Sequence, residues 1–443
     1  MLRKTLTPLF CVMFTFGLTA LSALGQEAAA PRLKLKSVHP APRGLTGEMR
    51  SRILSGEADS SAGGPVQLPH WSFSVTSSRD GNTYAGVMVG AKPVAGSQAT
   101  DVPVEIIPVI VNTVALGTAF NPNTGAITVA TGGAADNTTF NPTAADTACL
   151  ASPNDVPGTV FGQSPLFESA DFNYGGTDVG FTQATDAFQR ANFWNTINRG
   201  AYHVLLSPIK VMAPVTLNAP APSQGVGGLA LDIPTLFGLC GRIGIVDFGT
   251  IDNFVTSQIQ RLAPQGVTPG NLPIFLFYNT AFSLGDPTNL FTCCAGGYHN
   301  AVNISRVGEP PVFQTYSPID FDMTGFFIND SGSPVLDTEI ASHEVAEWMN
   351  DPLVINGVPA WGNIGQDIGI CQNNLEVGDP LTGNEAPRIF MPNHFTYHLQ
   401  ELAFFSWFYG SVNGGPPSLG LNDWFSDNDT FTANAGPVCQ PPQ

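Results

Sequence analysis

Several short stretches of the chain alternate between apolar and polar residues, or are apolar without a break, and these predict β-strands. Residues 71–75 alternate, Asp80-Gly81 is a turn signal, and residues 83–89 read as the returning strand, so this part predicts a hairpin. Further strands are predicted at residues 102–111, 202–211, 243–248, 272–278 and 312–316. Prolines within residues 102–111 predict an edge position or a bend there.

Apolar residues recur at helical spacing in a few other stretches. One predicts an aromatic-rich helix within residues 178–198, and another an amphipathic helix at residues 251–262. The second lies between two predicted strands, which together predict a β-α-β unit. The hydrophobic run at residues 395–409 is predicted to close the domain as a helix.

Residues 337–351 predict a further helix, with Ile340 and Met349 among its apolar residues. Asp337 or Thr338 can cap its N-terminus. Asp351 is followed by proline, which disfavours the helical conformation in the preceding residue and so ends the helix there.

The composition favours strands and loops with a few helices. The chain has 443 residues, including 47 glycines and 37 prolines, and only 12% are charged, whereas 43% are hydrophobic and can form a large core. We therefore expect an α+β fold with a mixed sheet. A flexible segment at residues 26–70 would precede a single domain at 71–443, with a β-rich part at 71–200 and the rest at 201–443.

The N-terminus predicts export. Arg3 and Lys4 precede an apolar run at residues 6–21, and small residues follow, as in a signal peptide cleaved near residue 25. A membrane anchor is the alternative, but the run is short for one. Removing residues 1–25 changes the formal net charge from −18 to about −20, which argues against nucleic acid or an anionic membrane as a partner. We expect a secreted or periplasmic protein.

Cysteine usage agrees with export. Six cysteines remain beyond residue 25, and an even number in an exported chain suggests up to three disulfides. The pairing stays open, and some of the six can equally be buried thiols. The adjacent Cys293 and Cys294 are expected to take separate partners.

The helix at residues 337–351 carries a candidate metal site. His343 and Glu347 are four positions apart and therefore leave the helix on one face, where they can hold one cation. Glu344 beside them can take a proton from water and return it to a leaving group. The alternative is an ordinary helix with an exposed histidine and two acids.

This H-E-x-x-E pattern resembles the H-E-x-x-H helix of zincin peptidases. In gluzincins a third ligand, a glutamate, follows the helix, with an aspartate shortly after it that orients a ligand histidine. The resemblance implies that Glu376 is the third metal ligand and that Asp379 orients His343. Zn²⁺ is the expected ion. A ligand set of one histidine and two glutamates is more anionic than the usual zinc site and widens the choice towards Mn²⁺, Fe²⁺ or Ca²⁺.

Residues 270–380 also resemble the phosphate-induced, exordium-like secreted proteins of plants. The similar features are Ala341 to Glu347, the Asp351-Pro-Leu-Val that follows, Glu376-Val-Gly-Asp379, and the Gly-His loop at residues 293–300. The cysteine that follows Glu-x-x-Asp in those proteins is replaced by Pro380-Leu381 here, so a local disulfide can differ. The resemblance implies export and a zincin-like site.

Two functions are consistent with these residues. The first is an exported metal-dependent hydrolase, a peptidase acting on extracellular or cell-wall peptide. The second is a non-catalytic secreted or cell-surface protein in which an ion, if present, only joins a loop to the helix. A structural site needs a fourth protein ligand, and Asp379, Asp351 or His299 can supply it. His299 can instead contact substrate or have a purely structural role.

Overall fold

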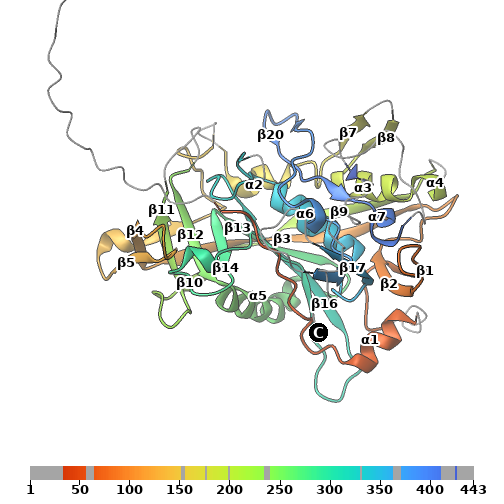
Figure 1. Ribbon diagram of the computed structural model, residues 1–443, viewed down its shortest axis with the longest axis horizontal. Coiled ribbons are helices and arrows are strands. Elements are labelled where there is room, and N and C mark those ends of the chain that lie inside the picture. The colour runs from red at the N-terminus through yellow and green to blue at the C-terminus, as the bar shows by residue number, and fades with distance from the viewer. Residues whose placement is uncertain are drawn as a thin grey trace, which may run out of the picture.

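The computed structural model describes residues 33–55, 64–150, 155–174, 177–197, 200–233, 240–329, 332–362, 371–410 and 425–426 (Figure 1). The signal peptide expected at residues 1–25 lies outside these ranges. None of the helices in them is long and apolar enough to span a membrane.

The largest sheet has seven strands and is mostly parallel. It follows the order β10-β3-β13-β16-β15, and β6 and β9 pair with other parts of the long central strand β3. Only β15 and β6 run antiparallel to their neighbours. The strands are β3 (Ala99–Thr113), β6 (Thr138–Phe140), β9 (His203–Val211), β10 (Val215–Ala219), β13 (Leu272–Tyr278), β15 (Asn300–Asn303) and β16 (Phe313–Phe321).

A second, five-stranded sheet has the order β14-β12-β11-β4-β5. Its strands are β4 (Ala115–Phe120), β5 (Ile127–Thr131), β11 (Gly228–Asp232), β12 (Arg242–Asp247) and β14 (Thr280–Ser283). The other strands form two-stranded pairs: β1 (His70–Thr76) with β2 (Thr83–Val89), β7 (Ala170–Tyr174) with β8 (Thr177–Thr182), β17 (Gly357–Gly362) with β18 (Cys371–Asn374), β19 (Ile389–Phe390) with β20 (Thr396–Tyr397), and β21 (Leu402–Ala403) with β22 (Phe425–Ser426).

Two helices cover opposite faces of the large sheet (Figure 1). They are α5 (Phe248–Leu262) and α6 (Glu339–Asn350). Alternate residues of β13 belong to different parts of the core: Ile274 and Leu276 share one with α6, whereas Phe275 and Phe277 share the other with α5. This explains why β13 is apolar without a break, since both of its faces are buried.

The remaining helices are short. They are α1 (Gly47–Leu54), α2 (Pro157–Gly162), α3 (Ala184–Asn192), α4 (Trp194–Ile197) and α7 (Phe405–Tyr409), with single 3-10 turns at Ala134–Asp136, Ala263–Gln265, Leu290–Thr292 and Asp379–Leu381. The expected mixture of helices with mixed sheets is therefore confirmed.

Two local predictions are corrected by the structure, and a third is narrowed. Residues 395–409 are helical only from Phe405 onward, and short strands precede α7. Of the edge position or bend predicted from the prolines of residues 102–111, the edge is excluded, because β3 is central; its register shifts next to Pro103, between Val102 and Val104, which agrees with the bend. The predicted β-α-β order is present, but β12 and β13 belong to different sheets.

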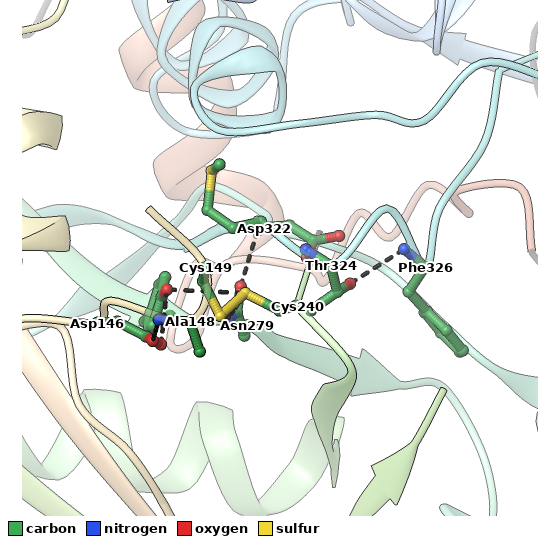
Figure 2. Close-up of a disulfide and its surroundings, with 10 residues drawn as sticks. Asp146, Ala148, Cys149, Cys240, Asn279, Asp322, Thr324 and Phe326 are labelled. Atoms are coloured by element: carbon green, nitrogen blue, oxygen red, sulfur yellow. Dashed lines mark hydrogen bonds between the residues drawn. A yellow bond between two sulfur atoms is a disulfide. The ribbon is translucent and has the colours of Figure 1, made fainter. Parts of the chain in front are cut away.

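The disulfide Cys149–Cys240 joins two loops beside the ends of both sheets (Figure 2). Asn279 lies next to it, and its amide contacts both sulfur atoms. The peptide bond between Cys293 and Cys294 is cis and brings their sulfur atoms together rather than towards the separate partners that were expected. Cys371 is disulfide-bonded as well, and Cys439 lies outside the described residues.

Part of the segment expected to be flexible packs on the domain. Residues 33–43, which we call the N-terminal strap, run along the domain towards α1 (Figure 1). Leu33 pairs with Phe327 and Arg43 pairs with Val302, so both ends of the strap are bound to other parts of the chain. The sequence of residues 26–70 shows no sustained periodicity and did not indicate these contacts, because each contact joins residues far apart in the chain.

Candidate metal centre

Acidic and histidine side chains gather where α6 meets three other segments. Helix α6 contributes three of them, the residue before β15 contributes one, the segment after β18 contributes two, and the strap contributes one. The seven residues, which we call the cluster, are His39, His299, His343, Glu344, Glu347, Glu376 and Asp379. All but His39 are buried, and the His39 side chain is 21% exposed.

Helix α6 holds its part of the cluster rigidly, because all twelve of its residues are buried. The helix packs on β16, and the Trp348 indole donates a hydrogen bond to Thr315 on that strand (3.0 Å). The spacing of four residues places His343 Nε2 3.1 Å from Glu347 Oε1, as the helical pattern predicted. The helix ends before Asp351, also as predicted, whereas Thr338 occupies the N-cap without a side-chain capping bond.

Three ligand-type atoms converge at one side of Glu347. His343 Nε2 lies 3.1 Å from Glu347 Oε1 and 3.5 Å from Asp379 Oδ1. Each of these residues offers one atom that lies within 4.8 Å of the other two. The backbone amides of Gly378 and Asp379 also donate to Glu347 Oε1 (3.1 and 3.2 Å) and fix that carboxylate.

Gln400 determines which nitrogen of His343 carries the proton. The Gln400 Nε2 donates to the carbonyl of Gly378 (2.7 Å), so its Oε1 is the atom that faces His343 Nδ1 at 2.9 Å. An amide oxygen only accepts, and therefore Nδ1 is the donor. The lone pair of neutral His343 is left on Nε2, where the two carboxylates converge. A ligand histidine held through its second nitrogen is typical of metal sites.

His299 has the same arrangement on the other side of Glu347. Its Nε2 lies 3.0 Å from the backbone oxygen of Asp351, which only accepts, so Nε2 is the donor. Its Nδ1 faces Glu344 Oε2 at 3.6 Å and Glu347 Oε2 at 3.8 Å. These three residues form a second set of atoms within 4.8 Å of one another. Glu347 therefore lies between two histidines, with one oxygen towards each.

Glu376 lies inside the cluster but belongs to neither set among the described residues. Its Oε1 accepts a hydrogen bond from the Asn374 amide (2.8 Å) and lies 3.3 Å from His39 Nδ1. Its Oε2 is 3.8 Å from His299 Nε2 and has no hydrogen-bond partner in the described part of the chain. Asp379 was expected either to orient His343 or to supply a fourth ligand. Its Oδ1 lies 3.5 Å from His343 Nε2, on the lone-pair side, while Gln400 contacts the other ring nitrogen, so its position agrees with the second of these expectations.

The strap closes the cluster from outside. His39 Nε2 lies 2.8 Å from Asp379 Oδ2, and the Ser37 hydroxyl donates to Asp379 Oδ1. Between the strap and α6 is a cavity of about 20 Å³, lined by residues 35–39 together with Gly297, Glu344 and Asp379. A cavity of this size holds one water molecule or one ion.

Burial and crowding of like charge perturb the acidic groups. Burial raises the pKa of Glu347 to about 8. The charge of His343 lowers this pKa, whereas the charges of Glu376 and Asp379 raise it further. Burial likewise raises the pKa of Asp351 to about 7. Burial would raise the pKa of Asp379 too, but the charge of His39 and the bond to His343 hold it well below its usual value.

The pKa values of the histidines are raised as well, but for a different reason. Burial opposes their protonation, but the surrounding carboxylates outweigh it and raise the pKa of His299 to about 9. The same balance, with Glu347 as the largest raising charge, lifts the pKa of His343 well above its usual value. A cluster this rich in carboxylates needs positive charge, which either protons or a metal ion can provide.

Sequence reasoning missed Gln400 and His39. Gln400 lies in the stretch predicted to be helical, and nothing in its neighbours indicates a metal site. Residues 33–36 alternate between leucine and lysine, but the alternation breaks at Ser37 and Val38, so no sequence signal connected His39 with the cluster. Searches against protein-family models, curated proteins and solved structures found no match for the chain.

Proposed function

We propose that the chain is an exported metal-dependent hydrolase with a zincin-like helix, and that its substrates are peptides outside the cell. The observation that carries the proposal is the orientation of His343. Its Nδ1 is used by Gln400, and its Nε2 faces one oxygen each of Glu347 and Asp379 at 3.1 and 3.5 Å.

The spacing of these atoms fits a divalent cation. Ligand atoms about 2.1 Å from a tetrahedral ion lie roughly 3.4 Å from one another. His343, Glu347 and Asp379 would hold the ion, and Glu376 remains a further predicted ligand. Zn²⁺ is the ion we expect, while a ligand set of one histidine and two carboxylates is also compatible with Mn²⁺, Fe²⁺ or Ca²⁺.

A bound ion of this kind supplies Lewis acidity, which polarises a carbonyl and makes water more acidic. Glu344 adjoins the metal ligands and lines the same cavity, so its carboxylate can take a proton from water there and deliver it to a leaving amine. His299 lies 3.6 Å from the Glu344 carboxylate and contributes positive charge beside it when protonated. Gly297 leaves room for Glu344, because a Cβ at that position would lie 2.9 Å from the Glu344 Cγ.

One observation favours the second function, a structural metal site. The strap brings Ser37 and His39 onto Asp379, so the cluster is covered by the chain itself. In a structural site such groups would permanently complete the coordination, whereas a catalytic site keeps one position for water.

Metal analysis of the mature protein with two variants tests the proposal. Glu344→Gln should keep the ion and abolish hydrolysis of a fluorescent casein substrate, whereas Glu347→Ala should lose the ion as well. Glu48→Gln, an exposed acid on α1, is the matched control and should change neither property. Retention of the ion in Glu347→Ala would exclude that residue as a ligand. Unchanged hydrolysis in Glu344→Gln would exclude the catalytic role.

A further inference from the structure

The N-terminal strap crosses the cluster in an extended form that is fixed at both ends. At one end Leu33 makes two backbone hydrogen bonds with the loop 326–328 (3.1 and 2.9 Å). At the other end Arg43 makes two backbone hydrogen bonds with β15 (3.0 and 2.9 Å), and its guanidinium binds the buried Asp252. Between these points the amide of Lys36 donates to the Cys294 carbonyl (3.0 Å).

Alternate side chains of the strap face the site. Leu35 is 9% exposed and packs so closely on the neighbouring loop that a Cβ at Gly296 would lie 3.1 Å from its Cδ2. Two residues on, Ser37 donates to Asp379, and two residues further His39 lies between Asp379 and Glu376. This two-residue period is that of an extended peptide lying against a surface.

The strap also limits access to the cluster. The cavity beside Glu344 is about 20 Å³, and residues 35–39 form one of its walls. This volume accommodates a water molecule but no part of a peptide. A peptide carbonyl can reach Glu344 and His343 from this side only if the strap moves away.

We infer that the strap occupies the groove in which a substrate peptide binds, and that it keeps the site closed until it is displaced. The inference rests on the proposed function, because it takes a peptide as the substrate. An extended peptide in this groove would form main-chain hydrogen bonds where Lys36 now does. It would place an apolar side chain in the position of Leu35 and a hydroxyl or basic side chain opposite Glu376 and Asp379.

The rate at which a chelator removes zinc tests this inference. The mature chain is loaded with Zn²⁺ and mixed with excess EDTA, and zinc release is followed with a colorimetric indicator. The double variant Ser37→Ala/His39→Ala should release zinc at least about tenfold faster, which is what losing one charge-assisted hydrogen bond produces. Lys210→Ala, whose ammonium donates to the Gln265 carbonyl (2.8 Å) away from the strap and the cluster, is the control and should stay within about twofold of the wild type.

Two further measurements distinguish the possible failures. The equilibrium zinc affinity of the double variant should match the wild type; a loss as large as that of His343→Ala would make His39 a resident ligand and overturn the inference.

Amide hydrogen exchange of residues 33–43 should be faster than that of β13, and faster still in the double variant. Exchange of the strap as slow as that of β13 would show that it leaves only on global unfolding, which also overturns the inference. If the wild type binds no zinc, the proposed function fails, and hydrogen exchange alone decides whether the strap is displaceable.

Discussion

Replacing Gln400 with leucine should weaken metal binding through His343 without removing any ligand. Gln400 is buried, accepts a hydrogen bond from His343 Nδ1 (2.9 Å) and donates one to the Gly378 carbonyl (2.7 Å). Leucine has a similar size but makes neither bond. The proton of His343 is then free to move to Nε2, where it would occupy the lone pair that faces Glu347 and Asp379.

The magnitude follows from these contacts. Loss of the group that orients a metal-bound histidine typically costs 10- to 100-fold in affinity, or about 1.4–2.7 kcal/mol. The buried His343 N–H and the Gly378 carbonyl also lose their partner, which should cost about 1–3 kcal/mol of folding stability for each group. Zinc affinity is measured by competition with a chromophoric chelator, and stability by urea unfolding of the metal-free protein.

Gln314→Leu is the matched control for this experiment. Gln314 is a buried glutamine whose amide donates to the carbonyls of Asn271 and Thr315 (3.1 and 2.9 Å), outside the cluster. It should lose stability to a similar extent but keep its zinc affinity. Zinc affinity of Gln400→Leu within about twofold of the wild type would refute the assigned orientation of His343.

Four further outcomes are expected. Gly378→Ala should weaken zinc binding by about 10- to 100-fold, because a Cβ at this position would lie 2.6 Å from the His343 ring and displace it. The φ of Gly378 is −84°, which alanine adopts without strain, so the backbone itself should not change. Unchanged zinc affinity would contradict this packing. The metal-free protein should be less stable at pH 9 than at pH 6.5. The pKa values of His299 (about 9) and Glu347 (about 8) in the folded protein exceed their ordinary values of 6.5 and 4.5, so the folded state holds protons that the unfolded state has already lost. The stability that these protons provide disappears as the pH rises towards 9. A melting temperature that increases from pH 6.5 to pH 9 would contradict this expectation. Zinc competes with the same protons and should bind more tightly across that pH range, as titration calorimetry can show. The double variant Cys149→Ser/Cys240→Ser opens a loop of 91 residues and should lose about 2–4 kcal/mol of stability, with zinc affinity unchanged because Asp146 and Asn279 beside this disulfide are outside the cluster.

The sequence predicted those features that depend on local periodicity. The hairpin β1–β2, the buried strand β13 and helix α6 all follow from the spacing of apolar residues and from turn or stop signals. The pairing of His343 with Glu347 was predictable for the same reason, because a helix fixes the relation between residues four apart.

Features that depend on contacts between distant segments were not predictable. The apolar residues 395–404 resemble a helix in composition, but they pack as short strands and loops around α6, and Gln400 reaches His343 from there. The pattern of apolar residues alone does not distinguish a buried helix from short buried strands, because contacts with the rest of the fold decide between them. The strap is a similar case, since its polar residues acquire partners only when the cluster has formed.

The contact between Ser37 and Asp379 spans 342 of the 443 residues, so the cluster and its cover come from segments far apart in the sequence. Synthesis proceeds from the N-terminus, and the strap therefore exists long before Asp379 and Gln400 have been made. A nascent chain that ends before Asp379 has neither the complete cluster nor a surface for the strap to cover. Any hydrolytic capacity would thus arise only after Gln400 has been made, when the strap is already present to shield it.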